Sequence, residues 1–153
     1  MLLTNDALKK YIQDTLTEAG IDSEDLELYT SRGITDFKSV CRLFSADSAE
    51  ASMMIDFGGG RINRPANGIR RGRMYLPIDK VKSFFQPCVD EIKAHIGSRI
   101  QDTHVSFVFS TGEIMDIPYL RQSFEQLCNP QGCQVLFSDS GYTNPGIADG
   151  AIN

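Results

Sequence analysis

The sequence predicts one domain of the α/β class, and three features carry this prediction. Residues 104–110 ("HVSFVFS") and 133–138 ("CQVLFS") have the β-branched and aromatic content of strands. The segment between them, Pro118 to Cys128, has proline at the first position expected of a helix. Apolar residues at helical spacing from Ile78 to Ile100 predict a long amphipathic helix. A strand, a turn at Gly112, a helix and a second strand predict two parallel strands with helices packed on them.

Three helical stretches are expected in the N-terminal part of the chain. The first is capped by Thr4 or Asn5 and is stopped by Gly20. The second covers about 23–29, and the third begins after Thr35. The apolar positions that predict the first and third stretches are Leu8, Ile12, Leu16 and Ala19, and Phe37, Val40 or Cys41, and Phe44.

Turns and short strands are expected in the middle of the chain. Residues 45–50 have the composition of a turn, 52–57 of a strand, and 65–72 of an exposed loop or hairpin crossing. The sequence "GRMYLP" (72–77) predicts a further short strand, and Pro87 predicts a local bend in the long helix that follows. We therefore expect a helical and hairpin part over about 1–100, and a strand-helix-strand-helix part over about 101–153 within one domain, 1–153. The last helix would begin in "NPGIADGAIN" (144–153).

Composition restricts the function classes. The chain has 153 residues, of which 41% are hydrophobic and 23% charged, as is ordinary for a soluble globular protein. Its net charge of −5 disfavours general affinity for nucleic acid. It has no apolar run long enough to span a membrane and no signal peptide at its start, so we expect a cytoplasmic protein that does not enter a membrane.

The cysteines predict neither a metal site nor a nucleophile. Cys128 and Cys133 are separated by four residues, and only His95 and His104 could complete a zinc site. No neighbouring residue suggests an activated thiolate. We expect reduced, semi-buried thiols, no metal and no catalytic residue.

Three segments of the second half resemble a known family. They are "GRMYLPIDKVKSFFQPCVDEIKAHI" (72–96), "VSFVFSTGEIMDIPYLRQSFEQL" (105–127) and "NPGIADGAI" (144–152). Their order is similar to the end of the nucleotide-binding domain of the seventy-kilodalton heat-shock chaperones, most closely the divergent, non-chaperone-like eukaryotic branch. The first half is similar through "LLTNDALKKYIQDTL" (2–16), which resembles the helix after the second phosphate loop, and "TDFKSVCRLFS" (35–45), which resembles the adenosine-contacting helix. The resemblance implies the second lobe of a two-lobe actin-like ATPase, a ribonuclease-H-like fold.

The resemblance also implies three adenosine contacts. The family's adenosine helix reads "E..KR..S", and Arg42 and Ser45 stand at its Arg and Ser positions, whereas Lys38 and Cys41 replace the Glu and Lys. Gly112 stands at the first of two glycines that let the backbone approach the sugar and phosphates. Arg42, Ser45 and Gly112 are therefore the expected contacts to ATP or ADP.

Other positions depart from the family's pattern. Glu113 replaces the second glycine and Asp116 stands where many relatives carry Arg, so two carboxylates would repel phosphate. The phosphate loops and the metal-holding Asp that phosphoryl transfer needs are missing from the chain, as are the chaperones' substrate-binding β-domain and lid. We expect neither autonomous ATP hydrolysis nor peptide chaperoning of the usual form.

The glycine run in "MMIDFGGGRINR" (53–64) is similar to a phosphate-binding turn only in composition. It follows the adenosine-type helix, where the family has a strand and a variable loop, and no Thr or Lys stands where a phosphate turn needs one. Five arginines follow close by; they are Arg61, Arg64, Arg70, Arg71 and Arg73. They could bind an acidic partner or RNA, although the missing aromatic interleaving favours a solvated loop.

Three functions remain open, and we favour the first. The chain could be a degenerate lobe that binds a protein partner, associates with itself, or binds nucleotide weakly. It could be half of an ATPase that another chain completes, in which case adding that chain would give ATP turnover. It could also be an α/β interaction module whose arginine loop binds an acidic protein or RNA, in which case binding would be salt-sensitive and would depend on Arg70 and Arg71.

Overall fold

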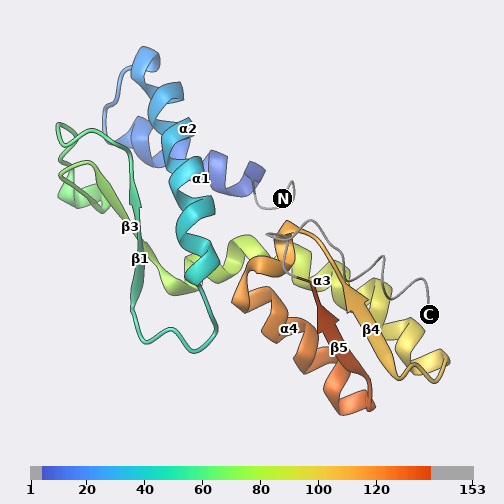
Figure 1. Ribbon diagram of the computed structural model, residues 1–153. Coiled ribbons are helices and arrows are strands. Elements are labelled where there is room, and N and C mark those ends of the chain that lie inside the picture. Colours follow the sequence, from blue (N-terminus) through green and yellow to red (C-terminus); the bar gives the residue numbers. More distant parts are fainter. Residues whose placement is uncertain (1–4, 139–153) are drawn as a thin grey trace.

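The computed structural model of the chain describes residues 5–138 and has a mixed α/β architecture, which confirms the predicted class. Figure 1 shows the helices and strands in chain order. They are α1 (Asn5–Glu18), α2 (Ser23–Val40), β1 (Ser52–Asp56), β2 (Ile69–Arg70), β3 (Arg73–Pro77), α3 (Ile78–Asp102), β4 (Phe107–Ser110), α4 (Pro118–Cys128) and β5 (Gln134–Phe137).

The N-terminal part is an antiparallel sheet with helices packed against it. The sheet has the strand order β1-β3-β2, with Met54 opposite Tyr75 and Asp56 opposite Arg73. Its strands alternate between buried and exposed residues, because successive side chains of a strand point to opposite faces. The buried face contacts α2, and α1 packs on α2 in turn (Figure 1).

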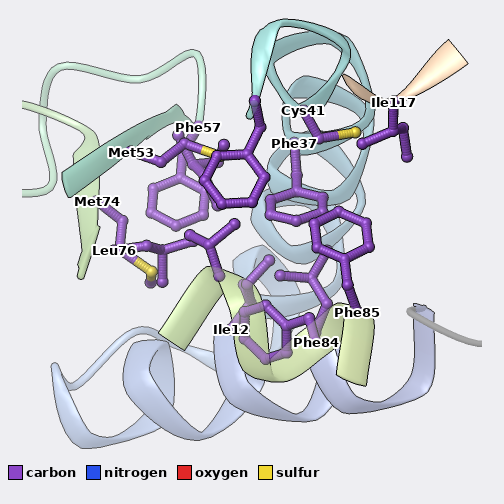
Figure 2. Packing of buried hydrophobic residues seen from close by; sticks show 14 of the residues in the cluster. Ile12, Phe37, Cys41, Met53, Phe57, Met74, Leu76, Phe84, Phe85 and Ile117 are labelled. Carbon is purple, nitrogen blue, oxygen red and sulfur yellow. The ribbon is translucent and has the colours of Figure 1, made fainter. Parts of the chain in front are cut away.

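Aromatic rings fill the core between these helices, the sheet and α3 (Figure 2). Phe37, from α2, lies stacked against Phe85 of α3 with 6.1 Å between ring centroids, and edge-on to Phe84. Leu120 and Ile117, from α4 and the residue before it, also belong to this core. The core therefore joins the N-terminal part of the chain to the start of α4.

A second, smaller core lies under the C-terminal strands. It is formed by Ile100, Met115, Phe124, Cys128, Cys133 and Val135. The 25 residues of α3 reach both cores, and Ile92 packs against each of them. In Figure 1, α3 accordingly runs from the antiparallel sheet to the strands β4 and β5.

Most predicted elements are confirmed. The helix expected over 118–128 and the strands expected near 52–57 and 72–77 are present, and the long helix contains Pro87. The parallel pairing of the last two strands is also confirmed. Gly20, with a φ of +79°, follows the first helix as predicted. The helix expected from residue 144 onward lies outside the described residues.

One prediction about the helices is wrong. The stretches expected at 23–29 and after Thr35 form one continuous helix, α2, followed by a short 3-10 turn over Cys41–Leu43. Gly33 lies within α2 and is buried. A β-carbon built there would lie only 2.7 Å from Cε1 of Phe57, so this glycine permits close packing of α2 on the chain after β1. It does not end the helix.

The prediction of a buried strand over 104–110 is also wrong, both in the extent of the strand and in its burial. β4 begins only at Phe107, and the side chains of Phe107 and Phe109 are exposed. Its aromatic and β-branched residues favour a strand, but they do not determine whether both faces of that strand are covered.

Candidate functional site

One face of the β4–β5 pair exposes large apolar side chains. Phe107 is 61% exposed, Phe109 54% and Leu136 43%. Phe107 pairs with Gln134 and Phe109 with Leu136, so these four side chains lie on one face of the pair. We call this surface the open sheet face.

The opposite face of the same strands is packed. Val135 is buried in the second core, and the ring of Phe137 lies edge-on to Phe124 of α4, with 6.4 Å between centroids. The guanidinium of Arg121 lies 5.1 Å from the centroid of Phe137. Helix α4 therefore packs against one face of the β4–β5 pair, and the other face is exposed.

A parallel sheet of two strands is unusual as a finished structure. Parallel sheets are normally covered on both faces, and an edge strand presents unpaired N–H and C=O groups that favour pairing with another strand. In the described part of the chain, β4 and β5 pair only with each other, so each has one edge without a neighbouring strand. Exposed apolar side chains together with two open edges are typical of a surface that associates with another protein.

The structure places the predicted adenosine contacts on two separate turns. Arg42 is exposed in the 3-10 turn after α2. Ser45 belongs to the following turn, in which its N–H donates a hydrogen bond to Oγ of Ser48 at 3.2 Å. Gly112 lies between β4 and α4 with a φ of +118°, and its carbonyl accepts a hydrogen bond from the N–H of Met115 at 3.0 Å.

The turn that contains Ser45 is docked on α4. The N–H of Tyr119 donates to the carbonyl of Phe44 at 3.0 Å, and the N–H of Ala46 donates to Oε1 of Gln122 at 2.8 Å. Gly112 lies six residues before the first residue of α4 in the chain. Over residues 5–138, no hydrogen bond joins Gly112 to Arg42 or Ser45. Glu113, which the resemblance predicts to stand in place of a second glycine, is exposed.

The glycine run after β1 is organised around Asp56. Oδ1 of Asp56 accepts a hydrogen bond from the N–H of Gly58 at 2.7 Å, and Oδ2 accepts one from Nε of Arg73 at 3.2 Å. The Gly58 hydrogen bond, followed by the Arg73 interaction, lowers the pKa of the Asp56 carboxyl below its ordinary value. The carboxylate thus faces N–H donors of its own chain.

The four cysteines are free, and all four are buried, whereas the sequence predicted semi-buried thiols. Burial raises the pKa of the Cys41 thiol from 9.0 to about 11, and it also raises the pKa values of Cys88 and Cys128. The thiols of Cys41, Cys88 and Cys128 therefore stay protonated near neutral pH, and a protonated thiol is a poor nucleophile and a poor metal ligand. Within residues 5–138, no three His, Cys, Asp or Glu side chains are grouped closely enough to hold a metal ion.

An apolar groove of about 540 Å³ lies between the end of α2 and the start of β1. Val40, Phe44 and Met53 line it, and Leu43, which is 85% exposed, stands beside them. Sequence reasoning missed both this groove and the open sheet face. The alternation of "FVF" in β4 was the one available signal for the open sheet face, because it places Phe107 and Phe109 on the same side.

No helix within residues 5–138 combines the length and apolar character needed to cross a membrane. Comparisons with protein-family models, with curated proteins and with solved structures find no match to the chain.

Proposed function

We propose that the chain is a protein-association unit, similar in element order to the second lobe of a heat-shock-chaperone ATPase domain, and that it acts without hydrolysing ATP. Its partner in this proposal is a second copy of the chain, bound through the open sheet face. The exposure of Phe107, Phe109 and Leu136 on a two-stranded parallel sheet is the observation that carries the proposal.

Self-association fits the chemistry of this face. Phe107, Phe109, Gln134 and Leu136 include no charged side chain, so two such faces meet without burying like charges. A twofold axis that brings the open sheet faces of two copies together packs the apolar side chains of one copy against those of the other. One contact of this kind removes the exposed apolar side chains of both copies from water.

The expected affinity is modest. Full burial of a Phe or Leu side chain contributes roughly 1.5–3 kcal/mol, and these three are already about half buried, so each gains roughly 1 kcal/mol. Six such side chains in a face-to-face dimer contribute roughly 6 kcal/mol, which the loss of translational and rotational freedom partly offsets. A dissociation constant in the micromolar range or weaker follows.

Nucleotide binding stays a prediction from the resemblance. Arg42, Ser45 and Gly112 are its expected contacts for ATP or ADP, and no metal ion is expected. The alternative of a half-ATPase requires a second chain that brings the phosphate loops. In that case, calorimetry of this chain with ATP and magnesium should give binding in about the micromolar range, whereas the favoured function expects binding no tighter than roughly millimolar.

The proposal is tested by sedimentation velocity of the full chain over about 1–200 µM, a range that spans the expected dissociation constant. The variant Phe107→Ser/Phe109→Ser should stay monomeric where the wild type associates. A matched control, Leu28→Ser/Leu43→Ser, removes two other exposed apolar side chains, 46% and 85% exposed, and should associate as the wild type does. A wild type that is monomeric throughout, or equal losses in both variants, would contradict the proposal.

A further inference from the structure

Three of the clustered arginines lie on one tight hairpin. Strands β2 and β3 are joined by a two-residue turn, Arg71–Gly72, whose φ angles are +50° and +74°. Two positive φ values at the centre of a hairpin are typical of the type I′ turn, which favours Asn-Gly and disfavours a long side chain at the first position. Arg71 is the only described non-glycine residue with a positive φ. An arginine is therefore less favourable than an asparagine at this position.

The pairing of the two strands adds a second unfavourable feature. Arg70 and Arg73 are direct partners in the antiparallel register, so their side chains leave the same face of the sheet next to each other. Like charges directly opposite each other are destabilising. Residues 70–73 thus hold two features that are unfavourable for stability, a long side chain in the turn and two like charges directly opposite each other. Such unfavourable features are expected where a surface serves binding.

The exposed side chains of the three-stranded sheet form two neighbouring rows close to the hairpin. Across the three strands, Asp56, Arg73 and Arg70 form one row. The neighbouring row holds Met54 and Tyr75, which are 39% and 43% exposed. We call this surface the arginine face; it consists of Met54, Arg70, Arg71, Arg73 and Tyr75. Tyr75 gives it the aromatic side chain that the linear spacing of the arginines did not reveal.

The arginines of the cluster differ in their contacts within the chain. Nε of Arg73 lies 3.2 Å from Oδ2 of Asp56, and Nε of Arg64 donates to the carbonyl of Ala19 at 3.0 Å. The guanidinium groups of Arg70 and Arg71 are exposed and form no ion pair or hydrogen bond with any residue in the range 5–138. These two groups are available to a ligand.

The backbone of the hairpin tip is held rigidly. The N–H of Gly72 donates to the carbonyl of Ile62 at 2.7 Å, and the N–H of Arg71 donates to Oδ1 of Asn63 at 3.3 Å. A β-carbon at Gly72 would lie 2.1 Å from the carbonyl oxygen of Gly59, so the chain passes too close for any other residue. A rigid tip reduces the conformational entropy lost when the arginines bind.

We propose that the arginine face binds an acidic peptide segment, with carboxylates on Arg70 and Arg71 and an apolar side chain against Tyr75 and Met54. Guanidinium groups suit carboxylates because they can form paired hydrogen bonds with them. RNA is the less suitable ligand, because Tyr75 is the one aromatic side chain on this face and binding of single-stranded RNA uses aromatic side chains on which successive bases stack. The proposal does not depend on association through the open sheet face.

Fluorescence anisotropy tests the proposal with a short labelled peptide of glutamates around one central leucine, and with the same peptide carrying glutamine in place of glutamate. Arg70→Gln/Arg71→Gln should weaken binding of the glutamate peptide about tenfold at low salt, since each exposed pair contributes modestly. Lys9→Gln/Lys10→Gln removes the same charge from exposed positions of α1 and should change binding less than about twofold. The glutamine peptide should not bind.

Failure of the glutamate peptide to bind the wild type, or equal losses in the two charge variants, would overturn the proposal. Tighter binding of an oligouridylate of equal net charge would replace the peptide by RNA and would also overturn it. Arg71→Asn supplies an independent readout, because asparagine suits the turn and removes the charge. It should raise the melting temperature by about 2–4 °C and still weaken peptide binding. Unchanged peptide binding in this more stable variant would show that Arg71 is only a turn residue.

Discussion

Replacing Gly33 by alanine in the middle of α2 has two opposite effects on stability, a gain in helix propensity and a loss from overpacking. Propensity alone favours alanine by about 1 kcal/mol in a helix interior. The added β-carbon, however, would lie 2.7 Å from Cε1 and 3.1 Å from Cδ1 of Phe57, and 3.2 Å from Cδ1 of Ile12. Phe57 and Ile12 are both 0% exposed, so neither side chain can move into solvent to relieve the contact.

The packing cost should outweigh the gain in helix propensity, so Gly33→Ala should destabilise the protein. Inserting one carbon into a well-packed core typically costs about 1–3 kcal/mol, which exceeds the gain in helix propensity. We expect Gly33→Ala to lower the free energy of unfolding by about 1 kcal/mol and the melting temperature by about 2–4 °C.

Urea unfolding followed by circular dichroism measures this difference, and Gly97→Ala in α3 is the matched control. A β-carbon at Gly97 meets only Cδ1 of Leu127, at an ordinary 3.8 Å, so helix propensity should dominate there and stabilise the protein by about 1 kcal/mol. The packing account of Gly33 would be refuted if both substitutions stabilised the chain equally.

Two further predictions concern the buried thiol and the adenosine contacts. The free energy of unfolding should fall as pH rises from 9.0 to about 11, because the folded state keeps the Cys41 thiol protonated while the unfolded chain ionises it. The loss could reach about 3 kcal/mol for the full shift. Chemical denaturation across this range should give a flatter pH dependence for Cys41→Ala, and an unchanged slope would show that other groups dominate. In calorimetry with ATP and magnesium, Arg42→Ala should behave as the wild type does, and a clear loss of ATP binding in this variant would mean that the adenosine site is active.

Local signals predicted the elements whose boundaries are set by local chemistry. Pro118 fixed the start of α4, and the alternation in "RMYLP" predicted β3, because both depend on residues adjacent in the chain. The parallel pairing of β4 with β5 also followed from the strand-helix-strand order.

Features that depend on distant residues could not be predicted from local signals. Gly33 resembles a helix break until Phe57 is seen against it, and Phe57 lies 24 positions later in the chain. The aromatic content of β4 favoured a strand, yet the exposure of Phe107 depends on which elements cover it.

The candidate sites also depend on residues whose arrangement local sequence signals predict only in part. The five arginines were visible as a cluster, whereas the register that sets Arg70 opposite Arg73 follows from the turn at Arg71 and Gly72. The alternation that places Tyr75 on the same face as Arg73 was available in the sequence. Arg42, Ser45 and Gly112 stay predictions from the resemblance.

Hydrogen–deuterium exchange at two protein concentrations tests association through the C-terminal strands most directly. Comparing the full chain well below and well above the midpoint of its association shows which backbone amides become protected in the assembled state. Association through the open sheet face predicts slower exchange at high concentration in 107–110 or 134–137, with no change in the β2–β3 hairpin. If the chain associates while exchange in 107–110 and 134–137 stays the same, another surface forms the contact and the central claim is wrong.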